Sequence, residues 1–126
     1  MKFLSGHFYI FLTILFAVTS QLIVKWQMNS RDFSVYHSVT EKFFHAFLLL
    51  FNPFIMLSII LTLLSGLAWM IAMTKFDISY AYPYTALGFV LILLFSALLF
   101  NEPLTLSKMA GVLLIILGIY LSSRGA

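Results

Sequence analysis

Apolar stretches of about 20 residues each divide the chain into predicted membrane spans. They cover about residues 5–26, 54–74, 79–100 and 106–123. No Asp, Glu, Lys or Arg occurs between residues 3 and 24, and residues 18–20 would form a poor signal-peptide cleavage site, which favours a first membrane helix. We therefore predict an all-α membrane protein with four transmembrane helices in a single domain that covers residues 1–126.

The segment between the first two spans follows a different pattern. Apolar residues recur in it at helical spacing, while its polar residues face elsewhere. The apolar positions are Phe33, Tyr36, Val39, Phe43, Phe47 and Leu50, and the polar positions are His37, Glu41, Lys42 and His45. Such a mixture of aromatic and basic residues is typical of an amphipathic helix in the membrane interface, predicted here over about residues 33–51. The alternative is a long aqueous loop that leads into an extended second span.

Short polar sequences mark the ends of the predicted spans. Asn52 can cap the second span, and Pro53 fits its first turn. Residues 101–103 close the third span with the sequence Asn-Glu-Pro. Because Lys75 and Asp77 lie in a very short turn, we expect the second and third spans, and likewise the third and fourth, to be antiparallel neighbours.

Composition excludes most soluble functions. The chain is 63% hydrophobic and 9% charged, whereas a soluble domain is roughly 25% charged. The absence of Cys excludes disulfides, thiol catalysis and thiolate metal sites. The formal net charge of +3 comes from scattered Lys and Arg, which form no nucleic-acid-binding patch. Four spans are too few to enclose a translocation path, so we expect an oligomer.

Basic residues are balanced between the two predicted sides of the membrane. One side carries Lys2, Lys75 and Arg124, and the other carries Lys25, Arg31, Lys42 and Lys108. Orientation normally follows the excess of Lys and Arg in cytoplasmic loops. Here the balance gives no preferred orientation, and it permits two copies to insert in opposite directions.

Polar residues inside the first span are candidate functional residues, because such residues are costly in lipid. Thr13, Ala17, Gln21 and Lys25 fall on one face at i, i+4 spacing, with Ser20 beside them. An ammonium costs about 3 kcal/mol near the bilayer centre and less near the end of a span. Lys25 is near an end, so its side chain either reaches the interface or joins Gln21 in an internal cavity that receives an anion such as phosphate.

Trp69 and Tyr82 are the candidate binding residues of the second and third spans. Ser58, Thr62, Ser65 and Ala72 share a face with Trp69 and are typical of helix packing. The indole N–H of Trp69 needs a hydrogen-bond partner. Tyr82 precedes Pro83, which lacks an N–H and is expected to leave a backbone carbonyl open toward a cavity. Tyr80 and Tyr84 are interpreted as interfacial tyrosines.

Small residues line one face of the fourth span. The face consists of Ser107, Gly111, Ile115, Gly118 and Ser122. Small side chains let helices approach closely in a membrane. We expect Gly111 and Gly118 to pack against another subunit and expect no chemistry from this span.

Three groups of residues together resemble a known superfamily. The first is Ser20-Gln21-Leu22 followed by Lys25; the second is Trp69, Ala81-Tyr82-Pro83 and Phe89-Val90; the third is Glu102-Pro103 with Gly111 and Gly118-Ile119. Their order and spacing resemble the four-helix, small-multidrug-resistance-like (EamA-like) members of the drug/metabolite transporter superfamily. The small subunits of the aminoarabinose–undecaprenyl-phosphate flippase are the most similar of these.

The resemblance implies a bundle of four helices that pairs with an identical or a homologous subunit, parallel or antiparallel. It also implies transport of a polyprenyl-phosphate-linked sugar across the bacterial inner membrane during envelope glycan or lipopolysaccharide modification, with no cofactor and no covalent chemistry. Proton-coupled multidrug exporters of this size carry a Glu where this chain has Ala17, which disfavours export of cationic drugs. An embedded cation such as Lys25 suits an anionic lipid headgroup.

The sequence thus predicts a flippase of lipid-linked sugars, or one subunit of it, and not an enzyme. We expect Lys25 to bind the phosphate, with help from Arg31 or Lys42. The sugar is expected to contact Gln21, Trp69, Tyr82 and Glu102. Two alternatives stay open: a small exporter of drugs or metabolites whose partner subunit supplies the acid, and a non-transporting membrane subunit of a glycosyltransferase system.

Overall fold

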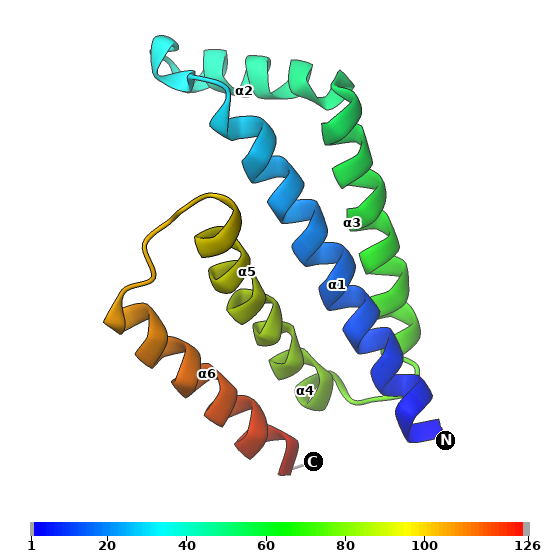
Figure 1. The fold of residues 1–126 in the computed structure, drawn as a ribbon. Coiled ribbons are helices and arrows are strands. Elements are labelled where there is room, and N and C mark those ends of the chain that lie inside the picture. The colour runs from blue at the N-terminus through cyan, green and yellow to red at the C-terminus, as the bar shows by residue number, and fades with distance from the viewer. Residues whose placement is uncertain (1, 125–126) are drawn as a thin grey trace.

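The computed structural model describes residues 2–124, with the side chains from residue 6 onward. Its elements are α1 (Lys2–Asn29), α2 (Val39–Leu48), α3 (Pro53–Ala72), α4 (Ile78–Ala81), α5 (Ala86–Leu99) and α6 (Leu106–Arg124). Within these residues, four helical stretches are long and apolar enough to cross a membrane: Gly6–Asn29, Pro53–Ala72, Ile78–Leu99 and Leu106–Arg124. The prediction of an all-α fold with four long apolar helices is confirmed (Figure 1).

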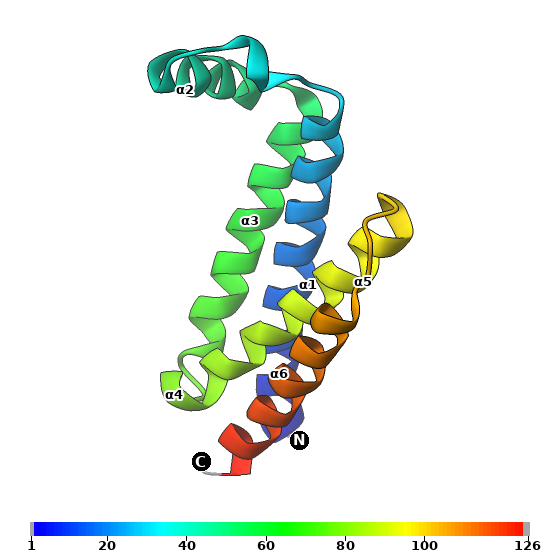
Figure 2. The ribbon, with the colours of Figure 1, turned by 90° about the vertical axis from the view of Figure 1, so that its left-hand side faces the viewer.

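α1 lies between its neighbours, with α3 on one side and α5 on the other (Figure 1). The second and third spans, which the turn at residues 73–77 joins, are therefore not packed against each other along their lengths. This corrects the expected pairing of these two spans. The cause is the third span itself: Pro83 cannot donate an N–H, and a 3-10 turn, η3 (Tyr82–Thr85), separates α4 from α5. Figure 2 shows α5 inclined to the α1–α3 pair, with α6 beside it.

The contact between α1 and α3, called the seam here, holds most of the buried residues. Ser20 donates its hydroxyl to the carbonyl oxygen of Ser58 at 2.9 Å, and Ser65 donates to the carbonyl oxygen of Thr13 at 2.8 Å. Both donors are buried, and so is Ser58. Small residues with a hydroxyl group let the two backbones approach closely, and each hydroxyl donates to a carbonyl oxygen of the other helix. The interpretation of Ser58 and Ser65 as packing residues agrees with this arrangement.

The connector between α1 and α3 is helical but is not one helix. Ser38 caps α2 by accepting from the N–H of Glu41 at 3.1 Å, and Glu41 accepts in return from the N–H of His37 at 3.3 Å. Separate 3-10 turns, η1 (Phe33–Val35) and η2 (Leu49–Phe51), flank α2. This reciprocal cap starts the helix at residue 39. The predicted helix over residues 33–51 is thus corrected to one short α-helix between two turns.

α2 crosses the ends of α1 and α3 (Figures 1 and 2), and its aromatic side chains are exposed. Phe43 is 71% exposed, and Phe44 and Phe47 are each 58% exposed. No residue of α2 is buried in the chain. Its position in the plane of the membrane interface stays a prediction, which these exposed rings favour.

α6 touches the rest of the chain only lightly. None of its residues is buried, and a side-chain carbon added at Gly111 or Gly118 would meet no atom of another residue within 4 Å. The small-residue face of α6 is therefore not occupied by another part of the chain that the structure describes. Its packing against a second subunit remains a prediction.

Candidate functional site

The carboxyl-terminal part of α1 and the loop after α5 bring opposite charges together. Nζ of Lys25 lies 3.7 Å from Oε1 of Glu102, and the two side chains are 51% and 37% exposed. An ion pair at this exposure is worth about 0–1 kcal/mol. Lys25 therefore has a counter-ion that another anion can replace at low energetic cost.

The backbone after α5 determines where Glu102 lies. Asn101 adopts a left-handed conformation with a φ angle of 55°, which Asn accepts more readily than most residues. The N–H groups of Phe100 and Glu102 both donate to the carbonyl oxygen of Ser96, at 3.0 and 3.4 Å. The chain thus turns back over the end of α5, and the carboxylate of Glu102 comes to face Lys25.

A groove of about 260 Å³ lies between α1 and α5. Its lining residues are Thr13, Ile14, Ala17, Val18, Gln21, Thr85, Gly88, Phe89 and Ile92. Gln21 is exposed and precedes Lys25 by one helical turn, so both side chains project from the same face of α1. Ser20 beside the predicted stripe is bonded to α3, whereas Thr13, Ala17 and Gln21 of the stripe all line this groove. Ala17 contributes no carboxylate to it.

Trp69 and Tyr82 contact each other but lie far from Lys25. Their ring centroids are 5.9 Å apart, and the rings meet edge to face at 78°. The two hydrogen bonds of the seam set the register of α1 and α3, which places Trp69 level with Tyr9. Tyr9 precedes Lys25 by sixteen residues, or about 24 Å along the helix axis at 1.5 Å per residue. In this conformation the predicted binding residues are split between the two ends of the bundle.

The two basic residues expected to assist Lys25 lie in different surroundings. Arg31 lines a pocket of about 440 Å³ at the connector, together with Ser30, Asp32, Phe33, Tyr36, His45, Leu48 and Leu49. The rings of Tyr36 and His45 stack there at 3.9 Å, although the helical pattern had placed them on different faces. Hydrogen bonds from the Ser34 hydroxyl and N–H hold the pKa of the Asp32 carboxyl below its usual value. Lys42 is exposed on α2 and lines no part of this pocket.

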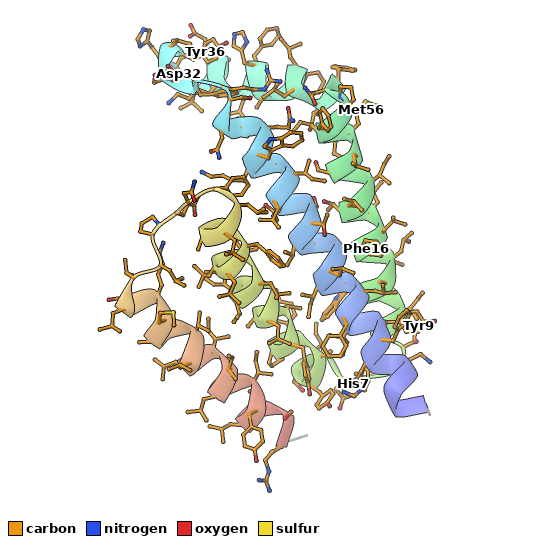
Figure 3. The ribbon with its side chains drawn as sticks, in the orientation of Figure 1. His7, Tyr9, Phe16, Asp32, Tyr36 and Met56 are labelled. Carbon is orange, nitrogen blue, oxygen red and sulfur yellow. The ribbon has the colours of Figure 1, made fainter. Side chains whose placement is uncertain are left out.

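A buried histidine at the opposite end of α1 was not predicted. His7 is 8% exposed, and its Nε2 lies 2.9 Å from the hydroxyl oxygen of Tyr80, which lies 3.3 Å from that of Tyr84. In Figure 3, His7 and Tyr9 lie at one end of the bundle, and Asp32 and Tyr36 lie at the other. The signal in the sequence is an ionisable residue inside a predicted span. Within residues 6–124, no three His, Asp or Glu side chains are grouped to hold a metal ion.

Known proteins resemble this chain over most of its length. The profile of the EamA-like transporter family matches residues 4–124. A probable 4-amino-4-deoxy-L-arabinose-phosphoundecaprenol flippase subunit ArnF of Serratia proteamaculans (strain 568) is 30% identical over 118 residues, which cover 90% of this chain and 88% of that protein. No solved structure matches the chain.

Other relatives match over a shorter region. A probable flippase subunit ArnE of Pseudomonas aeruginosa (strain UCBPP-PA14), named for the same lipid, is 35% identical over 75 residues, or 60% of this chain. The match covers 65% of that protein, less than two thirds of its length. A probable subunit ArnF of Photorhabdus laumondii is 44% identical over 64 residues, or 49% of this chain and 51% of that protein.

The family match and the four apolar helices agree with each other. The family is one of membrane transporters and not of enzymes, as the sequence had indicated. A multi-pass helical bundle with polar residues at both ends is the architecture that such a transporter needs. The chain belongs to the EamA-like transporter family.

Proposed function

We propose that this protein is a subunit of a flippase that moves a polyprenyl-phosphate-linked amino sugar across the bacterial inner membrane. The observation that carries the proposal is the half-exposed pair of Lys25 and Glu102 beside Gln21 and the groove along α5. The names of the relatives support the lipid class. Ala17 supports it further, because the groove lacks the acid with which a proton-coupled exporter would exchange a cationic drug.

In the proposed mechanism, the lipid phosphate replaces Glu102 as the partner of Lys25. A phosphate oxygen forms a charge-assisted hydrogen bond with an ammonium, as the carboxylate does, and the exposed pair costs little to separate. The released carboxylate of Glu102 then accepts a hydrogen bond from the amino group or a hydroxyl of the sugar, and Gln21 contacts the sugar from α1. Lys25 keeps an anionic partner and Glu102 keeps a hydrogen-bond donor throughout this exchange, so neither side chain is left without a partner in the membrane.

The other predicted residues act around this step. Arg31 lies six residues beyond Lys25, in the connector pocket, and is proposed to attract the phosphate before it reaches Lys25. Lys42 contributes to the same attraction from the surface of α2. Trp69 and Tyr82 contact the sugar after it has moved toward the other end of the bundle. The prenyl chain stays in lipid beside the apolar helices.

A second subunit completes the path, because the chain by itself leaves α6 exposed. We propose that Gly111 and Gly118 of α6 form the contact with an identical or a homologous subunit. Alternating access then results from rocking of the paired bundles about the binding sites.

Replacement of Lys25 by Met tests the proposal in lipid vesicles that contain the protein with its partner subunit. We expect transfer of the lipid-linked sugar to be abolished and the assembly to be retained, because only the phosphate partner is removed. Lys108→Met is the matched control, since Lys108 donates to the carbonyl oxygen of Pro103 at the start of α6. Undiminished transfer by Lys25→Met would contradict the proposal, and pH-dependent binding of cationic aromatic compounds would instead favour an exporter.

A further inference from the structure

A cavity lies at the end of the bundle opposite Lys25. It measures about 830 Å³ and is called the Lys75 cavity here. Its lining residues are Met73, Thr74, Lys75, Phe76, Asp77, Tyr80, Tyr84 and Ser123. They come from the end of α3, the following turn, α4, η3 and the last turn of α6. This open cavity is therefore bordered by the ends of the second, third and fourth spans, and α1 lies behind the tyrosines.

His7 fixes the tyrosines on the wall of this cavity. Tyr80 and Tyr84 lie four residues apart on the same face, and the hydroxyl of Tyr80 lies within hydrogen-bond distance of both Tyr84 and His7. The imidazole also packs edge-on against Phe76, with ring centroids 4.8 Å apart. An interfacial tyrosine that only anchors a helix in lipid does not require a buried imidazole partner. The arrangement instead holds the hydroxyl groups of Tyr80 and Tyr84 in place at the wall of the cavity.

Lys75 and Asp77 bring both signs of charge to the cavity. Both side chains are exposed, and neither forms an ion pair within the part of the chain that the structure describes. Nζ of Lys75 lies 6.0 Å from the ring centroid of Tyr9. A ligand with an anionic group and a cationic group would therefore find a partner for each in a cavity that Tyr80 and Tyr84 also line.

The distance between the two lysines suits the thickness of a membrane. Lys75 lies over Tyr9, which is about 24 Å along α1 from Lys25. The hydrocarbon core of a bilayer is about 30 Å thick. A polar headgroup that crosses the membrane needs a polar partner near each face, since charged groups are costly in between. The Lys25 pair and the Lys75 cavity lie at these two levels.

We propose that the Lys75 cavity is a second binding site for the headgroup of the transported lipid, where an amino sugar phosphate is held at the opposite membrane face. Lys75 binds the phosphate, Asp77 binds the amino group, and the hydroxyls of Tyr80 and Tyr84 bind the sugar. This inference rests on the proposed function and adds to it a place where the headgroup is received or released. It also gives a role to His7, a positioning residue that holds Tyr80.

Footprinting of lysine amines tests the site directly. The full chain in lipid nanodiscs is acylated with a water-soluble reagent while glucosamine 1-phosphate is titrated, and the modification of each lysine is followed by mass spectrometry. We expect the probe to slow acylation of Lys75 and not of Lys108, in the wild type and equally in Lys25→Met. Asp77→Asn should weaken this protection, because the amino group loses its partner.

Two outcomes of the footprinting would overturn the site. Acylation of Lys75 that stays unchanged across the titration would show that the cavity does not bind the headgroup. Equal protection by inorganic phosphate, in the wild type and in Asp77→Asn, would show a general anion site rather than one for an amino sugar. Tyr80→Phe keeps the ring but loses both the hydroxyl and its bond to His7, so we expect it to weaken the protection of Lys75.

Transfer measurements distinguish this inference from the proposed function. We expect Lys75→Met to lower lipid transfer about tenfold, as for loss of one hydrogen bond to a charged group, with partial recovery in Lys75→Arg. If Lys25→Met abolishes transfer but Lys75→Met leaves it unchanged, the second site is wrong and the proposed function stands. If Lys25→Met leaves transfer unchanged, the proposed function fails, whatever the footprint of Lys75.

Discussion

At the scale of single residues, the proposed transport depends on how easily Lys25 changes its partner. Glu102 is close enough to neutralise it and exposed enough to be displaced. A deeply buried pair would not serve this purpose, since separating it would leave an unpaired charge in a medium of low polarity. The exposure of the pair is thus as important as the distance between its charges.

Glu102→Gln separates the two roles that Glu102 has in the proposed exchange. We expect the sugar-free lipid, undecaprenyl phosphate, to bind up to about fivefold more tightly, because Lys25 no longer has a competing carboxylate. The amino-sugar-bearing lipid should gain nothing, because its amino group loses a partner. Both affinities can be measured by titration in nanodiscs with mass detection of the bound lipid.

The control for this prediction is Glu41→Gln on α2. It removes an exposed carboxylate in the same way, and its side-chain oxygen can still accept from the N–H of His37. Both affinities should stay as in the wild type. Weaker binding of undecaprenyl phosphate by Glu102→Gln would mean that the carboxylate does not compete with the phosphate.

The sequence allowed several single residues to be predicted, and the reasons for the others lie in tertiary structure. Asn52 caps α3 as expected, accepting from the N–H groups of Phe54 and Ile55 at 2.9 and 3.4 Å, because a cap is decided by neighbours in sequence. Glu102 was a candidate, but its pairing with Lys25 depends on the left-handed turn at Asn101. The role of His7 depends on tyrosines more than seventy residues away.

At the scale of elements, the seam between α1 and α3 holds the bundle in register. Its serines are small enough for close contact. Their hydroxyls donate hydrogen bonds to carbonyl oxygens across the seam or within their own helix. The resulting register separates Trp69 from Lys25 along the bundle. The same contact leaves the opposite face of α1 to α5, where the groove with Gln21 forms.

Enlarging Ser58 should weaken this seam. Ser58 is 2% exposed, so Ser58→Leu overfills the contact, and we expect a loss of about 1–3 kcal/mol in the free energy of unfolding. Ser58→Ala should cost less than about 1 kcal/mol, because the carbonyl oxygen that accepts from Ser20 is retained. Titration with a denaturing detergent measures both values. Equal stabilities of the two variants would contradict the packing described for the seam.

The four long helices were predictable because membrane spans impose a length and a composition. Which helices pack against each other was not predictable in the same way. The short turn at residues 73–77 suggested that α3 and α5 would pack together, but the break at η3 directs α5 to α1. The connector was predicted as helical from its spacing of apolar residues. Its division into three pieces follows from local caps at Asp32 and Ser38, which that spacing does not reveal.

At the scale of the whole molecule, polar sites lie at both ends of an otherwise apolar bundle. The Lys25 pair and the connector pocket occupy one end, and the Lys75 cavity occupies the other. In Figure 3, Asp32 and Tyr36 of the connector pocket lie at the first end, and His7, which contacts Tyr80, lies at the second. The chain leaves α6 exposed, so a lipid headgroup passing between these ends would need a second subunit to shield it. The proposed transport therefore requires a pair of subunits as well as an anionic lipid.

Native mass spectrometry of the protein, extracted together with its own membrane lipids, tests whether a pair of subunits binds a polyprenyl phosphate. We predict a dimer that retains an adduct with the mass of a polyprenyl phosphate, with or without a sugar, and that loses this adduct in Lys25→Met. The same spectrum gives the subunit count. A dimer that carries no such lipid, and that instead gains the mass of added cationic aromatic compounds, would contradict the account and identify an exporter.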